Sequence, residues 1–187
     1  MTVVVALEKD GVVYMGADTC TSRGKKKENE AKGEFGKIDI LPNGLFVGSA
    51  GLVQSKQSLL SHPEFFSFAD DKLTKDGIIR SFLPQVIALF KEKKEMEEDD
   101  VNLPISLLLA KDADLFVITS SLKVFRVRDY AIGSGMSFAF ASLREENDTV
   151  ENRLLNAMRV AERYDVGVKA PFVLVDTKER VFKEVRE

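Results

Sequence analysis

Residues 1–18, MTVVVALEKDGVVYMGAD, decide the fold of this chain. The β-branched run from Val3 to Leu7 predicts a strand, and Asp10-Gly11 is typical of a tight hairpin turn. The strand pattern resumes directly after that turn, from Val12 to Ala17. The chain is therefore predicted to open with an antiparallel hairpin.

The next segments alternate between polar stretches and extended runs. Residues Thr19 to Glu34 are polar, charged and punctuated by glycine, which predicts an exposed loop. Phe35 to Leu41 then forms a second extended run, and Pro42-Asn43-Gly44 predicts a turn. Leu45 to Ala50 is expected to be the antiparallel partner of that run.

Apolar residues recur at helical spacing after Gly51, in one short stretch and again from Ile78 to Phe90. Pro84 lies inside the second helix and removes a backbone donor, so we expect a bend near Arg80. The same patterns predict strands over 105–110, 115–119 and 123–127, helices over about 136–144 and 149–164, and closing strands over 172–176 and 181–185.

This order of elements predicts the fold class. Strands, two helices, strands, two helices and strands do not alternate as the elements of a parallel α/β fold do. An α+β fold fits better, with two mostly antiparallel sheets stacked between two helical layers as a four-layer αββα sandwich. At 187 residues the chain is long enough to bury a core as one domain, residues 1–187.

Composition excludes several classes of protein. A formal net charge of -3 with 44% hydrophobic residues is typical of a globular protein. The basic runs Lys25 to Lys27 and Lys91 to Lys94 are each followed by acidic residues, so neither predicts a nucleic-acid surface. The apolar run at the N-terminus is too short for a signal peptide or a membrane span. The single cysteine, Cys20, fits a small packed residue in a reducing compartment, and we expect a cytoplasmic protein.

Five separated segments resemble the β-subunits of proteasomes and the bacterial HslV peptidase, which are N-terminal nucleophile (Ntn) hydrolases. Their order and approximate spacing agree over most of the chain, and their joint occurrence carries the resemblance. They are Thr2 to Ala6 after a lone methionine, Gly16-Ala17-Asp18, Gly36-Lys37-Ile38, Val47 to Gly51, and Ile132 to Gly135. The resemblance implies a proteasome-like Ntn-hydrolase fold.

The resemblance implies that Thr2 becomes the nucleophile once Met1 has been removed. A hydroxyl is a poor nucleophile unless a base lies beside it, and the α-amine of the same residue supplies one. An unperturbed α-amine titrates at about 7.7–8.0, so it can accept the hydroxyl proton and later deliver it to the leaving amine. A retained Met1 would turn this amine into an amide, which cannot act as a base.

Further site residues are carried over from the same resemblance. Lys37 is expected to lie near the threonine, where its ammonium would lower the pKa of the amine and stabilise a developing alkoxide. Asp18 would hold this ammonium through a charge-assisted hydrogen bond. Gly48 matches the glycine whose N–H donates to the oxyanion. Ser134 and Asp165 match the serine and aspartate that support the threonine amine.

Two residues are predicted to bind substrate. Phe46 points to the same side of its strand as Gly48, so it is expected to form the floor of the pocket for the residue before the scissile bond. A phenylalanine there would favour small substrate residues. Thr21 is the second predicted substrate-binding residue.

The resulting prediction is a threonine peptidase that cleaves peptides or unfolded proteins without a cofactor or metal. The resemblance also implies a ring-shaped homo-oligomer and an ATP-driven unfoldase partner. Two alternatives stay open, an inactive proteasome-like structural subunit and a small-molecule amidohydrolase on the same fold. One histidine, His62, and one cysteine cannot supply the usual zinc ligands.

Overall fold

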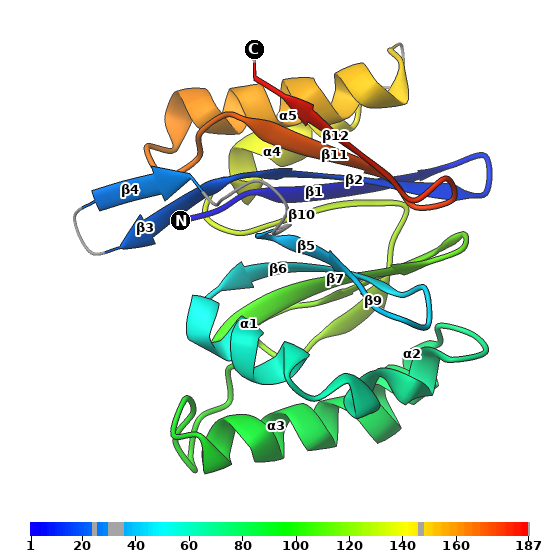
Figure 1. The fold of residues 1–187 in the computed structure, drawn as a ribbon, viewed down its shortest axis with the longest axis vertical. Helices are drawn as coiled ribbons and strands as arrows, with labels where there is room; N and C mark the ends of the chain where they lie inside the picture. The colour runs from blue at the N-terminus through cyan, green and yellow to red at the C-terminus, as the bar shows by residue number, and fades with distance from the viewer. Residues whose placement is uncertain (24–25, 30–35, 146–147, 187) are drawn as a thin grey trace.

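Two antiparallel sheets form the centre of the molecule (Figure 1). The computed structural model describes residues 1–23, 26–29, 36–145 and 148–186, without the side chains of 21–23 and 26–29. Within these residues, the first sheet has the order β10-β1-β2-β11-β12 and the second the order β5-β6-β7-β8-β9. The strands of the first are β1 (Val4–Lys9), β2 (Val12–Asp18), β10 (Asp129–Ile132), β11 (Phe172–Asp176) and β12 (Val181–Val185). Those of the second are β5 (Ile38–Ile40), β6 (Phe46–Gly51), β7 (Ile105–Lys111), β8 (Asp114–Ile118) and β9 (Val124–Arg126).

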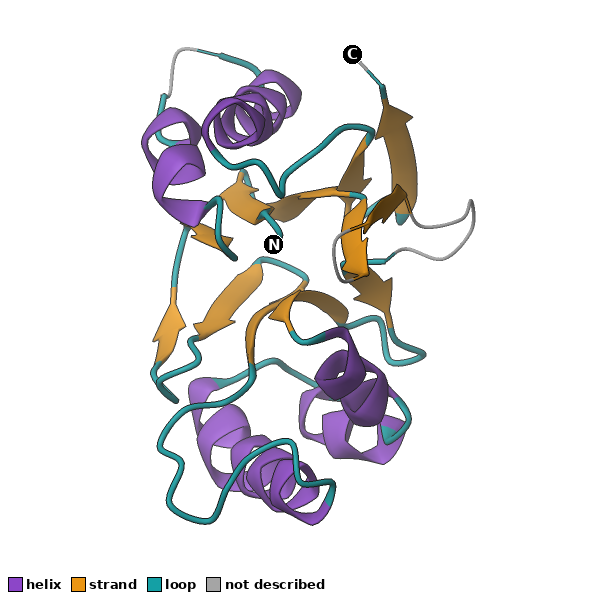
Figure 2. Cartoon of the chain, turned by 90° about the vertical axis from the view of Figure 1, so that its left-hand side faces the viewer, coloured by secondary structure: helices purple, strands orange, loops and turns teal. Residues whose placement is uncertain are grey.

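Helices cover the outer face of each sheet (Figure 2). The first sheet is covered by α4 (Met136–Leu143) and α5 (Val150–Tyr164). The second is covered by α1 (Val53–Leu60), the 3-10 helix η1 (Pro63–Ala69), α2 (Lys75–Gly77), the π-helical η2 (Ile78–Phe82) and α3 (Leu83–Glu92). The predicted α+β fold with four αββα layers is confirmed.

The opening hairpin is as predicted, and its burial explains its unbroken apolar run. Strand β1 pairs with β2 on one side, with Val5 opposite Gly16, and with β10 on the other, with Val4 opposite Ile132. Val5 faces the helical layer, whereas Val4 faces the second sheet. Because both faces of β1 are covered, every position from Val3 to Leu7 is buried, and a polar face would cost desolvation free energy.

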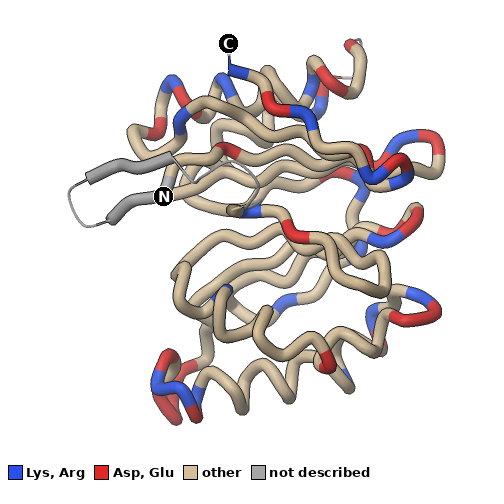
Figure 3. Tube along the Cα trace, in the orientation of Figure 1, with Lys and Arg blue, Asp and Glu red and all other residues tan. Residues whose placement is uncertain are grey.

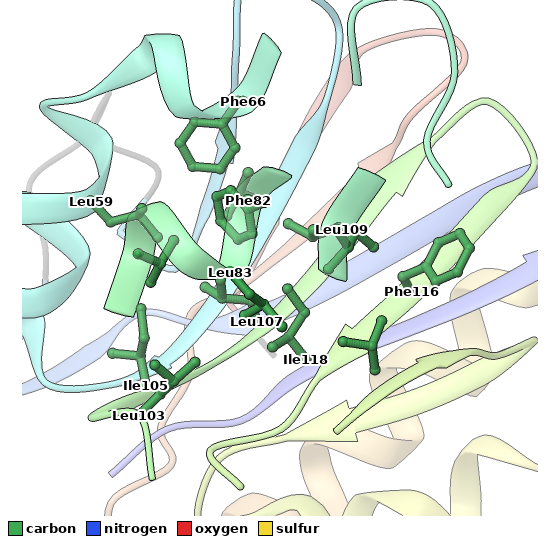
Figure 4. Packing of buried hydrophobic residues seen from close by; sticks show 14 of the residues in the cluster. Leu59, Phe66, Phe82, Leu83, Leu103, Ile105, Leu107, Leu109, Phe116 and Ile118 are labelled. Atoms are coloured by element: carbon green, nitrogen blue, oxygen red, sulfur yellow. The ribbon is translucent and has the colours of Figure 1, made fainter. Parts of the chain in front are cut away.

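The helix in which a bend is predicted near Arg80 is unbroken but contains a π-helical segment at that place. The chain widens into the π-helical η2 and then continues as α3, in which Pro84 occupies the first turn. The helix is continuous from Lys75 to Glu92, and just before the proline the N–H of Leu83 bonds five residues back, to the carbonyl of Ile78. This wider turn accommodates a residue that has no N–H to donate. Phe66 and Phe82 pack with their ring centroids 5.1 Å apart above Leu107 and Leu109 of β7 (Figure 4).

Two parts of the secondary-structure prediction need correction. Within the predicted loop from Thr19 to Glu34, β3 (Cys20–Arg23) pairs with β4 (Lys26–Asn29). The sequences of these two strands, CTSR and KKEN, show no apolar alternation from which strands could be predicted. Residues 24–25 and 30–35 lie outside the described part of the chain. The sequence prediction also did not assign β10, which pairs with β1.

Charged residues lie mainly in the turns and along the outer helices (Figure 3). The strands between the two helical layers are largely uncharged in the same view. Among the described helices, none is both long enough and apolar enough to cross a membrane.

Candidate active site

Thr2 lies in a buried position where the start of the chain meets the corner between β10 and α4. Its backbone N donates to Oγ of Ser134 at 3.1 Å, and the N–H of Gly135 donates to its carbonyl oxygen at 3.2 Å. The residue is only 8% exposed. The pairing of β1 with β10 explains this arrangement, because it places the residues that follow Ile132 directly beside Thr2.

Gly133 makes the close contact at this corner possible. Its φ is +96°, and a Cβ at this position would lie 2.2 Å from the carbonyl oxygen of Thr2. Only glycine accommodates both the left-handed backbone and this approach. Gly133, in the segment from Ile132 to Gly135, therefore allows the backbone of Thr2 to pack directly against this corner.

Gly133→Ala is expected to destabilise the fold and displace Thr2. A left-handed backbone costs a non-glycine residue about 1–2 kcal/mol, and the steric overlap adds about 1–3 kcal/mol. Gly11→Ala is the matched control, since Gly11 has φ +78° but its added Cβ would meet nothing within 4 Å. Chemical denaturation should show a clearly larger loss for Gly133→Ala. Equal losses in the two variants would contradict the proposed close contact.

A buried ion pair lies next to Thr2. Nζ of Lys37 donates to Oδ1 of Asp18 at 2.7 Å, and the two side chains are 6% and 0% exposed. The same carboxylate oxygen accepts the N–H of Val3 at 2.8 Å, and Oδ2 accepts the N–H of Cys20 at 3.2 Å. Lys37 also donates to the carbonyl of Cys20 at 2.7 Å. Asp18 thus ties the residue after Thr2 to the ammonium of Lys37.

Opposing effects set the ionisation of Asp18. Burial raises the pKa of its carboxyl, while the charge of Lys37 and the hydrogen bonds from Lys37 and Val3 lower it. The net direction is upward. The carboxylate therefore depends on its ammonium partner to stay charged, which couples the two residues.

A cleft of about 320 Å³ opens at Thr2 and Lys37. It is bordered on one side by the end of β6 and by α1, and on the other by the start of the chain. The described residues that line it are Met1, Thr2, Cys20, Gly36, Lys37, Ser49, Gly51, Leu52, Val53, Lys56 and Ile105. The structure therefore places Thr2 and Lys37 together in one cavity.

Gly48 and Phe46 are absent from the described lining of this cleft. Both point into the core between the two sheets, where Phe46 is 1% exposed and a Cβ at Gly48 would lie 2.9 Å from Cε of Met15. The prediction that both share one side of β6 is correct, but that side is the sheet interface. Phe46 therefore does not form the cleft floor. The cleft is bordered instead by Ser49 and Gly51, which point the other way.

Asp165 and Thr21 are the remaining predicted site residues. Asp165 is buried at the C-terminal end of α5, where its Oδ1 accepts the N–H of Gly167 at 2.8 Å. Its Oδ2 is buried without a hydrogen-bond partner among the described residues. Met1 packs against Gly167, since a Cβ there would lie 1.9 Å from Cβ of Met1. The side chain of Thr21 lies outside the described part of the chain.

Met1 precedes Thr2 in this structure and contacts its hydroxyl. Oγ1 of Thr2 donates to the carbonyl oxygen of Met1 at 2.7 Å, so the hydroxyl is engaged by the residue that precedes it. The backbone N of Thr2 is a peptide amide in this state. Thr2 has a free amine only after Met1 has been removed.

Of the residues in the described lining, the sequence analysis predicted only Thr2 and Lys37 as site residues, and it missed Gly51 and Lys56 among others. Gly51 ends the segment from Val47 to Gly51 that carries part of the resemblance. Side chains alternate along β6, so the sequence could have placed Gly51 on the opposite face from Phe46. Lys56 carries no motif, and only the packing of α1 beside β5 brings its ammonium to the cleft. Among the described residues, no cluster of histidine, cysteine, aspartate and glutamate could hold a metal ion.

The chain has the proteasome-like Ntn-hydrolase fold, as three solved structures show. BPH from Thiobacillus denitrificans is 22% identical, with a TM-score of 0.73 and 98% of both chains covered, and it has also been solved in complex with epoxomicin. Anbu, an ancestral β-subunit from Yersinia bercovieri, is 16% identical with a TM-score of 0.72 over 99% of this chain and 87% of its own. Eukaryotic HslV from Trypanosoma brucei is 18% identical with a TM-score of 0.65 over 92% and 97%. No protein-family model and no curated protein matches the sequence.

Proposed function

We propose that this protein is a threonine-type endopeptidase in which Thr2 attacks peptide bonds after Met1 has been removed. The observation that carries the proposal is the cleft in which Thr2 and Lys37 lie together, with the ammonium held by buried Asp18. Oγ attacks the scissile carbonyl and its proton moves to the α-amine. The tetrahedral intermediate then expels the leaving amine, which takes that proton, and water hydrolyses the remaining ester.

The proposal gives the neighbouring residues electrostatic and positioning roles. The ammonium of Lys37 disfavours a second positive charge nearby, so it lowers the pKa of the amine toward neutrality and stabilises the developing alkoxide. Ser134 holds the nitrogen of Thr2 at 3.1 Å and keeps it oriented. Asp165 Oδ2, a buried acceptor beside the turn at Gly167, is assigned to the ammonium that forms when the amine takes up a proton.

We assign the oxyanion donor to the main chain at the end of β6. Gly48 remains the candidate from the resemblance, but Gly51 is the glycine of β6 in the described lining of the cleft. Gly51 has φ +140°, and a Cβ there would lie 2.4 Å from the carbonyl oxygen of Pro104. The missing side chain thus makes room for the carbonyl of Pro104, and we assign the donor to Gly51 because of its place in the lining of the cleft.

We further propose that the protein works in the cytoplasm as a ring of identical subunits with an ATP-driven unfoldase. The unfoldase rests on the resemblance alone. One surface feature supports self-association: Phe138 on α4 and Tyr164 at the end of α5 are 39% and 62% exposed, and their rings stack 5.4 Å apart. Exposed aromatic side chains of this kind are enriched at protein interfaces.

Intact mass of the purified protein with and without epoxomicin tests this proposal. We expect a mass lacking Met1 that gains one inhibitor per chain, and native mass spectrometry of the same sample should show an assembly. A chain that loses Met1 but binds no inhibitor and cleaves no peptide would favour the inactive structural subunit. Hydrolysis of small amides without cleavage of peptides would favour the amidohydrolase, and a monomer would contradict the ring.

A further inference from the structure

A second lysine, Lys56, reaches the cleft from α1 and has no role in the proposed chemistry. Its Nζ donates to the carbonyl of Gly36 at 2.5 Å and pairs with Oδ2 of Asp39 at 2.9 Å. Its side chain is 15% exposed. Burying a lysine costs desolvation free energy, so a lysine that only keeps the protein soluble would be expected on the open surface. The position of Lys56 in the cleft therefore indicates a binding role.

Lys56 and Lys37 have similar surroundings. Each ammonium donates to one backbone carbonyl, that of Gly36 for Lys56 and that of Cys20 for Lys37, and each forms an ion pair with one carboxylate, Asp39 and Asp18 respectively. An ammonium has three N–H donors, so each lysine keeps one donor beyond these contacts. Both side chains line the cleft, and that remaining donor is what each can offer to a bound molecule.

The two lysines line the cleft, whereas their carboxylate partners do not. Neither Asp18 nor Asp39 is among the lining residues, and the described lining contains two lysines and no acidic side chain. Both ammonium groups therefore border the cavity, while the carboxylate of Asp18 is buried and that of Asp39, 25% exposed, lies outside the described lining. Low-dielectric walls focus such a field, so the cleft favours an anionic group.

We propose that the cleft selects a substrate with a carboxylate side chain, aspartate or glutamate, at the residue whose carbonyl Thr2 attacks. The inference rests on the proposed function. Lys37 is committed to the nucleophile, so Lys56 is the specificity-determining residue that receives the carboxylate. Exposed Leu52 and Val53 at the start of α1 border the same cleft and can contact the methylene groups of that side chain. This preference replaces the one predicted from Phe46.

The test compares three fluorogenic peptides that differ only in glutamate, glutamine or lysine before the scissile bond. We expect kcat/KM for glutamate to exceed that for glutamine by about tenfold, equivalent to ~1.4 kcal/mol. The lysine peptide should be the poorest substrate. The glutamate-to-glutamine ratio should also fall as salt is added, because salt screens the attraction.

Variants of Lys56 assign the preference to that residue. Lys56→Gln should bring the ratio close to one, and Lys56→Arg should keep it. Lys91→Gln is the matched control, because Nζ of Lys91 likewise donates to a backbone carbonyl and a carboxylate, both of Glu98, but lies outside the cleft. The glutamate-to-glutamine ratio is taken within each variant, so a general loss of activity, which lowers both values equally, does not change it. If Lys56→Gln does not fold, Lys56→Gln with Asp39→Asn takes its place, since it leaves no unpaired carboxylate.

The outcomes separate this inference from the proposed function. Turnover of all three peptides with no preference for glutamate, or a preference unchanged in Lys56→Gln, would overturn the acidic specificity and leave the peptidase in place. The absence of both turnover and an epoxomicin adduct would overturn the peptidase, and the specificity with it.

Discussion

Thr2→Ala is expected to abolish peptide hydrolysis, with a loss in kcat/KM of at least about 10³-fold, because it removes the nucleophilic oxygen. The fold should survive the substitution. In the described residues the hydroxyl of Thr2 donates to the carbonyl of Met1, so its removal takes away no hydrogen bond to another element. The backbone contacts to Ser134 and Gly135 do not depend on the side chain. Peptide turnover and labelling by epoxomicin measure the first effect, and thermal unfolding measures the second.

Two further variants show whether this loss reports the nucleophile. Thr2→Ser keeps an oxygen at the same place and should keep measurable turnover. Thr19→Ala removes a hydroxyl that donates to the carbonyl of Pro171 at 2.9 Å, outside the lining of the cleft, and should keep turnover close to that of the parent. Turnover or an inhibitor adduct in Thr2→Ala would rule out this residue as the nucleophile.

The parts of the fold that could be predicted from sequence are those whose pattern has a local cause. The run from Val3 to Leu7 and the turn at Asp10-Gly11 give the hairpin, because a strand covered on both faces has no polar alternation. Thr149 caps α5, because its side chain accepts the N–H of Asn152 at 3.2 Å, and threonine is a residue type that favours this position. Pro84 predicts an irregularity near Arg80, where the π-helical η2 lies.

The parts that could not be predicted depend on which partner covers a face. Alternation shows that Phe46 and Gly48 share a side of β6, but only the position of the second sheet shows that this side is the core. Lys56 reaches the cleft because α1 packs beside β5, and no local pattern encodes that contact. The roles of Thr2, Lys37, Asp18, Ser134 and Asp165 remain predictions, although the structure brings the first four together around the start of the chain.

Lys37→Ala is expected to lower the free energy of unfolding by about 3–5 kcal/mol as well as to abolish activity, because it leaves the buried carboxylate of Asp18 unpaired. An exposed pair provides the control. Arg80→Ala breaks the pair with Asp76, whose side chains are 77% and 75% exposed, and should change stability by no more than about 1 kcal/mol. Chemical denaturation of both variants measures the difference. Similar small losses in the two would mean that Asp18 and Lys37 do not depend on each other.

The pH dependence of Lys37→Ala identifies the cause of its instability. Burial raises the pKa of Asp18, and removing Lys37 removes the largest effect that opposes this rise. A carboxyl whose pKa is higher in the folded than in the unfolded chain binds its proton more tightly in the folded state, so stability is regained as the pH falls through the folded pKa. The deficit of Lys37→Ala relative to the parent should therefore shrink as the pH is lowered from 7. The double variant with Asp18→Asn should lose this pH dependence, recover part of the stability and stay inactive. A deficit that does not change with pH would place the cause in lost packing of the lysine stem.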